Sequence, residues 1–233
     1  MPSWKIHLKV ANNIKEKINI YEDKDKFMLG NVMPDMYNGY VIKSLSKIVP
    51  YDVSHYRTPI IINGGKFVLP DYEMFKNVHL DELEDSLLLG YLTHLMTDYY
   101  FNKYSYTNCC VIDDKGEVSG IKTKKGEILN CNKKTMIRMK QEDFKSFEDI
   151  INLERHNFSY NSDVIDSLKK LKAFSVEKED MIKTINYLNS LTMPKDTTKE
   201  RPLILFSKET LNTMINDCTD FILNYIQRTI KNN

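Results

Sequence analysis

The sequence predicts a mainly α fold, a single-domain multi-helix bundle with small β-hairpin insertions. Apolar residues recur at helical spacing along most of the chain, whereas β-branched residues flank glycine turns in only two short stretches. The chain has 233 residues, of which 42% are hydrophobic and 28% charged, so it can bury one core of ordinary size. We find no internal repeat and no linker rich in Pro, Gly or Ser, and therefore expect one domain over residues 1–233.

The helices expected in the first half cover residues 4–18, 23–29, 37–48 and 80–102. The first carries apolar residues or histidine at positions 7, 11, 14 and 18, which form one stripe. Gly30 and Pro34 end the second. The pattern is strongest over 80–102, where acidic residues at the start suit the positive end of the helix dipole. Its stripe consists of Leu83, Leu87, Tyr91, His94, Asp98 and Phe101.

β structure is expected in two places. Residues 59–69 hold Asn63-Gly64-Gly65 between β-branched residues, which predicts a short hairpin or an extended loop. Residues 110–131 hold two Lys-Gly turn signals and predict one or two small hairpins, a decoration of the helical domain. Helical patterns return near residues 134–154, 162–173, 177–190 and 207–230, and Pro194 and Pro202 bracket a loop.

The composition argues against several classes of protein. The formal net charge is +1, so no large basic field is expected to hold duplex nucleic acid. No apolar run approaches the ~18 residues of a transmembrane helix, and residues 1–17 lack the apolar core of a secretory signal, so we expect a cytoplasmic protein. The four cysteines form no CxxC pair and are expected to be free thiols: Cys109, Cys110, Cys131 and Cys218.

His94 and Asp98 are the first candidates for chemistry. They lie four residues apart on the stripe of the best-predicted helix, so both side chains project the same way. A buried carboxylate is costly unless it is paired or bound to a cation, and imidazole nitrogen together with carboxylate oxygen suits zinc. A structural hydrogen-bonded pair would give the same pattern. Gly90, one turn earlier, leaves room for another backbone or a substrate.

Three residues elsewhere add to this pair. His7 heads the stripe of the first helix and points inward, either as a core histidine or as a ligand. Asp35 follows the turn at residues 30–34, either as a helix N-cap or as a carboxylate on a rigid loop. His55 is expected in a loop before the first β stretch.

Two weaker candidates flank the long helix. His79 precedes it, as a capping or surface residue, a partner of a ligand, or a substitute ligand. An aromatic cluster follows the proposed site and belongs either to the core or to a hydrophobic cleft. Its members are Tyr99, Tyr100, Phe101, Tyr104 and Tyr106.

The candidates form an ordered pattern. An early helical histidine precedes a Gly-Asn-x-x-Pro-Asp loop and a loop histidine, and Gly-Tyr-Leu-Thr-His-x-x-x-Asp follows on a long helix. This pattern resembles the bacterial zinc-dependent phospholipase C family, whose fold is shared with single-strand-specific zinc nucleases. The resemblance covers residues 1–105 in motif terms, and it implies a helical domain of that type.

The resemblance also implies roles for single residues. His55 and His94 are expected to bind one zinc ion, with Asp35 beside them. Asp98 is expected to bridge to a second zinc, which His7 also binds. Asp35 is further expected to act as the catalytic general base or to orient the attacking water.

Two departures from the family limit the expected cofactor to one or two zinc ions. Family members bind a third zinc through two further histidines and a glutamate, but here the only later histidine is His156, and Tyr160 stands four residues after it. Glu142 and Asp143 offer oxygens without a matching motif, so a complete third site is not expected. The family's processed N-terminal tryptophan is also a ligand, a role that we do not assign to Trp4, because three residues precede it.

The expected function is zinc-dependent hydrolysis of a phosphodiester by metal-activated water, as in phospholipase C. The expected partner is a phosphodiester substrate, such as a phospholipid or its head group. Two alternatives stay open: a zinc-dependent single-strand nuclease or nucleotidase, and a non-catalytic helical protein that retains the fold. The sequence leaves the oligomeric state open.

Overall fold

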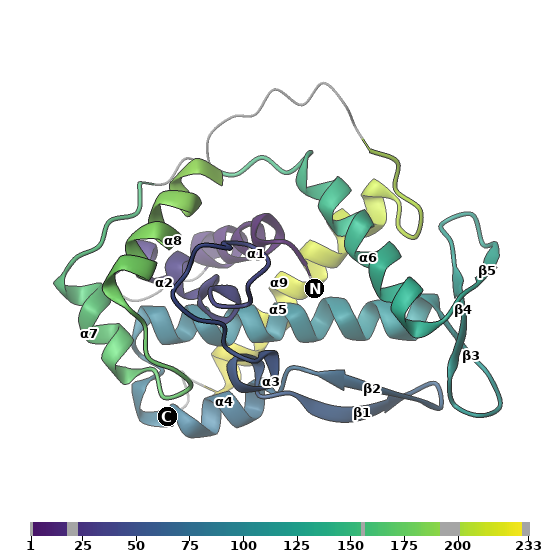
Figure 1. Ribbon diagram of the computed structural model, residues 1–233, viewed down its shortest axis with the longest axis horizontal. Helices are drawn as coiled ribbons and strands as arrows, with labels where there is room; N and C mark the ends of the chain where they lie inside the picture. Colours follow the sequence, from purple (N-terminus) through teal and green to yellow (C-terminus); the bar gives the residue numbers. More distant parts are fainter. Residues whose placement is uncertain (1, 18–22, 155–156, 192–200, 230–233) are drawn as a thin grey trace.

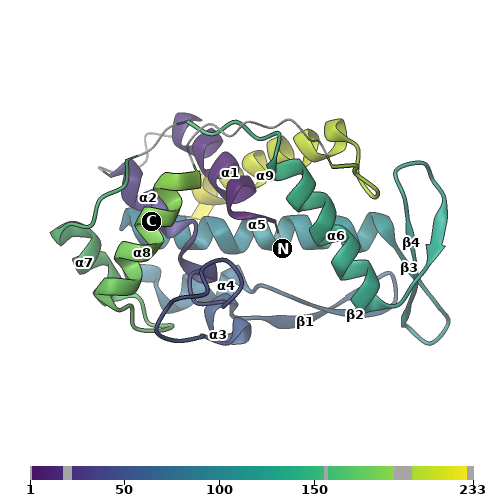
Figure 2. The ribbon, with the colours of Figure 1, turned by 45° about the horizontal axis from the view of Figure 1, so that its top comes forward.

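A computed structural model describes residues 2–17, 23–154, 157–191 and 201–229. The long helix α5 (Ser86–Cys109) runs through the middle of the molecule, and the other helices pack around it (Figures 1 and 2). Helices α1, α2, α4, α7 and α9 all contact α5, and α1 also packs on α9. The fold is therefore mainly helical, as the sequence predicts. The remaining helices are α1 (Trp4–Lys17), α2 (Lys24–Gly30), α3 (Tyr51–His55), α4 (Tyr72–Val78), α6 (Lys133–Glu148), α7 (Ser162–Lys170), α8 (Lys178–Leu191) and α9 (Lys208–Thr229).

Both predicted β stretches form antiparallel sheets at the edge of the helical body. Strands β1 (Thr58–Ile62) and β2 (Gly65–Leu69) form a hairpin, with positive φ angles at Asn63 (51°) and Gly64 (83°) that suit a tight turn. Strands β3 (Cys110–Ile112), β4 (Val118–Lys122) and β5 (Ile128–Asn130) form a second sheet beyond the end of α5 (Figure 1).

Two glycines let α2 and α5 touch through their backbones. A Cβ placed on Gly90 would lie 2.1 Å from the carbonyl oxygen of Phe27, and one placed on Gly30 would lie 2.0 Å from that of Leu87. No other residue type fits at either position without moving a helix. The space that Gly90 leaves open is therefore taken by the backbone of α2.

The predicted helix over residues 80–102 is placed too early at both ends. Helix α5 begins at Ser86, because the Asp85 side chain accepts a hydrogen bond from the N–H of Leu87 (3.0 Å) and caps the first turn. Residues Leu80–Glu82 form a separate 3-10 turn. The helix continues past Asn102 to Cys109, and in these turns the side chains of Asn102 and Ser105 donate to carbonyl oxygens four residues earlier.

The prediction of a helix at residues 37–48 is wrong, because residues 36–50 form a loop. Gly39 has a φ of +76°, and the N–H of Val49 donates to the carbonyl of Tyr37 (3.0 Å), which closes the loop at its base. The carboxylate of Asp180 on α8 accepts hydrogen bonds from the Tyr37 hydroxyl (3.0 Å) and the Ser46 N–H (3.1 Å). The distant carboxylate of Asp180 thus accepts a backbone N–H that a helix would have paired internally.

None of the described helices combines the length and the apolar character needed to cross a bilayer. All four cysteines are free thiols, as expected, and Cys109 and Cys218 are buried.

Candidate metal centre

Five buried side chains from separate elements meet against the middle of α5. Helix α5 itself supplies His94 and Asp98, and α1 supplies His7. His55 is the last residue of the short helix α3 rather than part of a loop. Asp35 ends a 3-10 turn that follows α2, and its side chain caps no helix. Each of the five is at most 2% exposed.

The nitrogen and oxygen atoms of this group face one another at ion-pair distances. The two oxygens of Asp98 lie 3.3 Å from Nε2 of His7 and 3.5 Å from Nε2 of His55. Nε2 of His55 lies 3.2 Å from Nε2 of His94 and 3.7 Å from Oδ1 of Asp35. The potential ligand atoms form two sets that share His94, one with His7 and Asp98 and the other with Asp35 and His55.

The orientation of His94 follows from the close contact between α2 and α5. Gly30 and Gly90 bring the two backbones together. The residue directly after α2 is Asn31, and its carbonyl oxygen lies 2.7 Å from Nδ1 of His94. A carbonyl can only accept, so Nδ1 of His94 carries the hydrogen. Nε2 of the neutral ring therefore presents its lone pair to the cluster. The ring of His7 stacks on it, with centroids 3.8 Å apart.

His55 and His94 are held in the neutral form that binds metals. Burial lowers the pKa of His94 to about 4 and lowers the pKa of His55 well below its ordinary value, with Asp98 opposing both shifts. Nδ1 of His55 is 2.8 Å from the hydroxyl of Ser54, which leaves Nε2 toward the cluster. Near neutral pH both rings are uncharged, and a neutral imidazole is a zinc ligand.

The two carboxylates differ in their electrostatics. Burial raises the pKa of Asp35 to about 6, and the nearby charge of Asp98 adds to this rise while His94 opposes it. For Asp98, burial acts in the same upward direction, but His7, His94 and His55 together lower its pKa below the usual range. Asp98 is therefore ionised throughout the physiological range, whereas Asp35 titrates close to it.

The donor set fits a bound cation. Among the residues that the structure describes, both ring nitrogens of His7 and one oxygen each of Asp35 and Asp98 are buried without a hydrogen-bond partner. Buried polar atoms of this kind are costly unless something satisfies them. Ligands about 2.0–2.1 Å from a tetrahedral zinc are separated by roughly 3.3 Å. The contacts of 3.2 to 3.7 Å within this group are close to that spacing.

Tyr51 is a residue of the site that the sequence reasoning missed. Its hydroxyl donates a hydrogen bond to Oδ2 of Asp98 (2.5 Å), and its ring stacks on His55 with centroids 3.5 Å apart. Burial raises the pKa of Tyr51 well above its ordinary value, so the phenol stays protonated and remains a donor. Its position four residues before His55, on one face of a helix, is the only local signal that could have pointed to it.

Lys140 of α6 was also missed. It is 1% exposed, and its ammonium group donates to the side-chain oxygen of Asn102 (2.5 Å) and lies 4.5 Å from the ring centre of Tyr106. Asn102 in turn lies one turn after Asp98 and donates to its carbonyl (2.7 Å). Burial lowers the pKa of Lys140 to about 8, against an upward pull from Asp98.

The weaker candidates lie apart from the five. His79 is buried, but its ring contacts Phe75 (4.5 Å between centroids) and lies 3.7 Å from Glu82, and neither set of potential ligands includes it. The aromatic residues of the cluster pack against other aromatic side chains, and Tyr99 and Tyr100 share Phe221 as a neighbour. Other contacts of the cluster include Tyr99 with Tyr72, Phe101 with Phe144 and Tyr106 with Phe67.

The residues considered for a third zinc are occupied by other contacts. Asp143 accepts hydrogen bonds from the backbone N–H groups of Ile204, Leu205 and Phe206 (2.7 to 2.9 Å). Glu142 lies 3.8 Å from Arg138, and His156 falls outside the described residues. Trp4 packs edge-on against Tyr187.

Comparison with known proteins supports the interpretation of this cluster as a zinc site. Neither the curated proteins nor the solved structures include a significant match to this chain. The model of one protein family, described as zinc dependent phospholipase C, matches residues 6–101. That segment contains all five candidate residues. Over residues 6–101, the resemblance of this chain to the zinc-dependent phospholipase C family is therefore confirmed.

Proposed function

We propose that this protein is a zinc-dependent phosphodiester hydrolase of the phospholipase C type. The observation that carries the proposal is a cluster of three histidines and two carboxylates, fully buried, with donor atoms facing one another and several lacking other partners. The match to the family model adds independent support for zinc. The residues proposed to hold one or two zinc ions are His7, Asp35, His55, His94 and Asp98.

Each residue has a proposed task. His94 and His55 offer neutral Nε2 atoms, and Asp98, whose oxygens face His7 and His55, is suited to bridge two ions. Zinc, when bound, supplies polarisation of the phosphoryl group and acidification of the attacking water.

Asp35 is proposed as the general base, because its buried carboxylate lies 3.7 Å from Nε2 of His55 and 4.0 Å from Nε2 of His94, beside the proposed position of the attacking water. It takes a proton from the attacking water as the new P–O bond forms. It then returns the proton to the alcohol oxygen as the old P–O bond breaks. The products are an alcohol and a phosphomonoester, which for a phospholipid are diacylglycerol and the phosphorylated head group.

The test combines metal analysis with two substrates. Protein purified without chelator and reloaded with zinc is assayed with a chromogenic phosphocholine ester and, separately, with single-stranded DNA. We expect at least one zinc equivalent per chain and hydrolysis of the ester. Asp35→Asn should lower the rate by about 100-fold or more, the usual contribution of a general base. His94→Ala should lose both zinc and activity.

His79→Ala is the matched control, because His79 is an equally buried histidine outside both sets of ligand atoms. It should keep its zinc and its activity even if it is less stable. Absence of zinc after reloading would contradict the proposal. Cleavage of DNA without hydrolysis of the ester would favour the nuclease alternative. Unchanged activity in both Asp35→Asn and His94→Ala would favour a non-catalytic protein.

A further inference from the structure

The loop of residues 36–50 exposes large apolar side chains. Tyr40 is 85% exposed and Ile48 is 73% exposed, the highest values among the large hydrophobic residues that the structure describes. Ile48 lies against the backbone next to Tyr40, because a Cβ at Gly39 would lie 3.2 Å from Cδ1 of Ile48. The two exposed side chains therefore share one loop surface, here called the patch, and exposed large apolar side chains gathered on one surface are typical of a binding site.

The loop is held firmly, so this exposure does not come from loose chain. Its base is closed by the hydrogen bond from Val49 to Tyr37 (3.0 Å), and Asp180 of α8 accepts the N–H of Ser46 (3.1 Å). Lys183 of α8 donates to the carbonyl of Ser44 (2.9 Å). These bonds fix the backbone from below and leave Tyr40 and Ile48 pointing to solvent as a preformed platform.

The charge of the loop is one-sided. Residues 36–51 include Lys43 and Lys47 and no Asp or Glu. Lys47 lies 3.5 Å from Glu177 and is partly neutralised, whereas Lys43 is exposed. Apolar side chains flanked by lysines match the boundary of an anionic bilayer, where acyl chains accept the former and lipid phosphates attract the latter.

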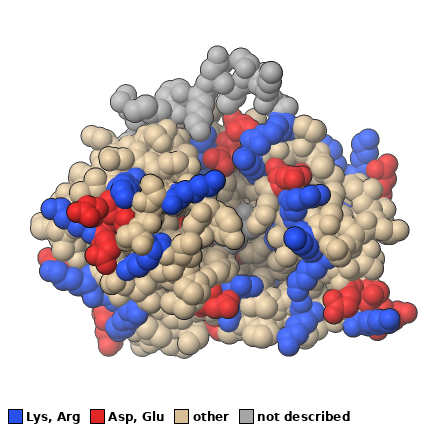
Figure 3. All heavy atoms as spheres, viewed as in Figure 1, with Lys and Arg blue, Asp and Glu red and all other residues tan. Residues whose placement is uncertain are grey.

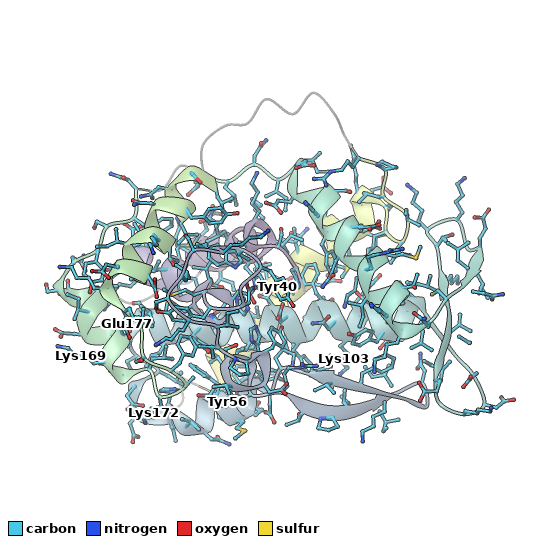
Figure 4. The ribbon with its side chains drawn as sticks, in the orientation of Figure 1. Tyr40, Tyr56, Lys103, Lys169, Lys172 and Glu177 are labelled. Carbon is cyan, nitrogen blue, oxygen red and sulfur yellow. The ribbon has the colours of Figure 1, made fainter. Side chains whose placement is uncertain are left out.

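The loop that carries the patch connects two residues of the metal centre. The loop begins directly after Asp35 and ends directly before Tyr51, whose hydroxyl bonds Asp98. Figure 4 places Tyr40 over the middle of the face, above α5. In the same view, Figure 3 shows this face hollowed at its centre, with lysine and arginine side chains gathered along the α6 side of the hollow.

We propose that Tyr40, Lys43 and Ile48 form an anchor that docks the protein on an anionic phospholipid surface. Docking through this patch would hold the hollowed face of Figure 3 against the bilayer. The choice of a lipid surface as partner rests on the proposed function. The binding step itself needs no turnover and can be measured separately.

The experiment is sedimentation of the full chain with vesicles of phosphatidylcholine alone or mixed equally with phosphatidylglycerol. The protein should bind the mixed vesicles better. The double variant Tyr40→Ser/Ile48→Ser should lower the partition coefficient by about tenfold or more, since two apolar side chains no longer enter the interface. Lys43→Gln should lower it by roughly fivefold, and less at high salt. Hydrolysis of a soluble phosphocholine ester should stay unchanged in both variants.

Ile128→Ser and Lys125→Gln are the matched controls. Ile128 is 59% exposed on β5, at the end of the molecule away from Tyr40 (Figures 1 and 4), and Lys125 lies in the exposed turn before that strand. Both controls should bind vesicles as the unmodified protein does.

Three results would overturn the anchor: no binding to either vesicle, equal binding by the loop variants, or a dimer in sedimentation velocity that the loop variants dissociate. The last would identify a second copy as the occupant. Loop-dependent vesicle binding without any ester hydrolysis would sustain the anchor while refuting the proposed function. Hydrolysis of the ester without vesicle binding would do the reverse.

Discussion

The two carboxylate oxygens of Asp98 have different hydrogen-bond partners in the structure. Oδ2 accepts the hydrogen bond of Tyr51, whereas Oδ1 faces His7 and has no hydrogen-bond partner among the described residues. Asp98 could be found in the sequence because a carboxylate on an apolar helical stripe is anomalous by itself. The contact of Tyr51 with Asp98 could not, because the two residues lie 47 positions apart and the only local signal at Tyr51 is its spacing from His55.

Replacing Tyr51 tests whether its hydroxyl positions Asp98 for a metal. Tyr51→Phe should weaken zinc affinity about tenfold, because partners that orient metal ligands typically contribute that much. It should also lower the free energy of unfolding by about 1 kcal/mol. Competition titration with a chromophoric chelator measures the affinity. Tyr37→Phe removes a hydroxyl that bonds Asp180 instead, so it should reduce stability and leave zinc affinity intact. Equal affinities in the two variants would refute the role.

Replacing Lys140 tests the charge buried beside Asn102. Burial lowers its pKa from 10.5 to about 8, so between these values the unfolded chain binds a proton that the folded chain does not. The free energy of unfolding therefore falls as the pH drops from about 10.5 to about 8. Below that window, the buried charge of Lys140 lowers it by the full amount of about 3 kcal/mol. Lys140→Met removes the dependence.

Urea unfolding of both proteins at about pH 7 and about pH 10 measures this effect. The unmodified protein should gain stability relative to Lys140→Met at the higher pH. A difference that is the same at both pH values would show that the ammonium group is not destabilised by burial.

At the scale of elements, local signals predict the helices whose determinants lie within them. Helix α2 begins where Asp23 accepts the N–H groups of Asp25 and Lys26 (3.0 Å each), which is an ordinary N-cap. The loop at 36–50 has the apolar spacing of a short helix, yet it bonds to Asp180, more than a hundred residues later. No local pattern could show that this carboxylate would be there.

Gly90→Ala tests the contact on which the position of α2 depends. An added Cβ would lie 2.1 Å from the carbonyl of Phe27, so α2 must move and the protein should lose about 3 kcal/mol or more of unfolding free energy. In an uncrowded helix the same change stabilises by about 0.5 to 1 kcal/mol, so the sign alone is diagnostic. Because Asn31 would move with α2, the hydrogen bond to His94 should weaken and zinc affinity should fall as well.

Chemical denaturation and zinc titration together check this prediction. Asn108→Ala, an exposed substitution near the end of the same helix, is the control and should change stability by no more than about 0.5 kcal/mol. A stabilised Gly90→Ala protein would mean that α2 and α5 do not touch at this position.

At the scale of the whole molecule, the proposed zinc would cross-link distant parts of the chain. The five candidate residues come from α1, α3, α5 and the turn after α2. Without a cation, the carboxylates of Asp35 and Asp98 share a buried site with the uncharged rings of His55 and His94, an arrangement that costs folding free energy. Metal binding should therefore contribute to the stability of the entire fold.

Removing the metal should lower the thermal midpoint. With free zinc about a hundredfold above its dissociation constant, the native state gains about 2.7 kcal/mol, which corresponds to roughly 5 to 10 °C for a chain of this size. Calorimetry before and after chelation, and again after zinc is restored, measures the shift. His94→Ala should show little response to zinc. An identical midpoint in all three conditions would argue against a metal centre.

The sequence by itself determined the mainly helical fold, both β insertions, and the five residues that the structure brings together. It did so because helical periodicity, glycine turns and misplaced polar residues are local properties of the chain. Tertiary structure alone decided the loop at 36–50, the contacts of Tyr51 and Lys140, and the backbone contact at Gly90. Each of these features depends on a partner from a distant segment. The free energy of folding in a packed core depends on which groups are brought into contact, and a local sequence pattern does not contain that information.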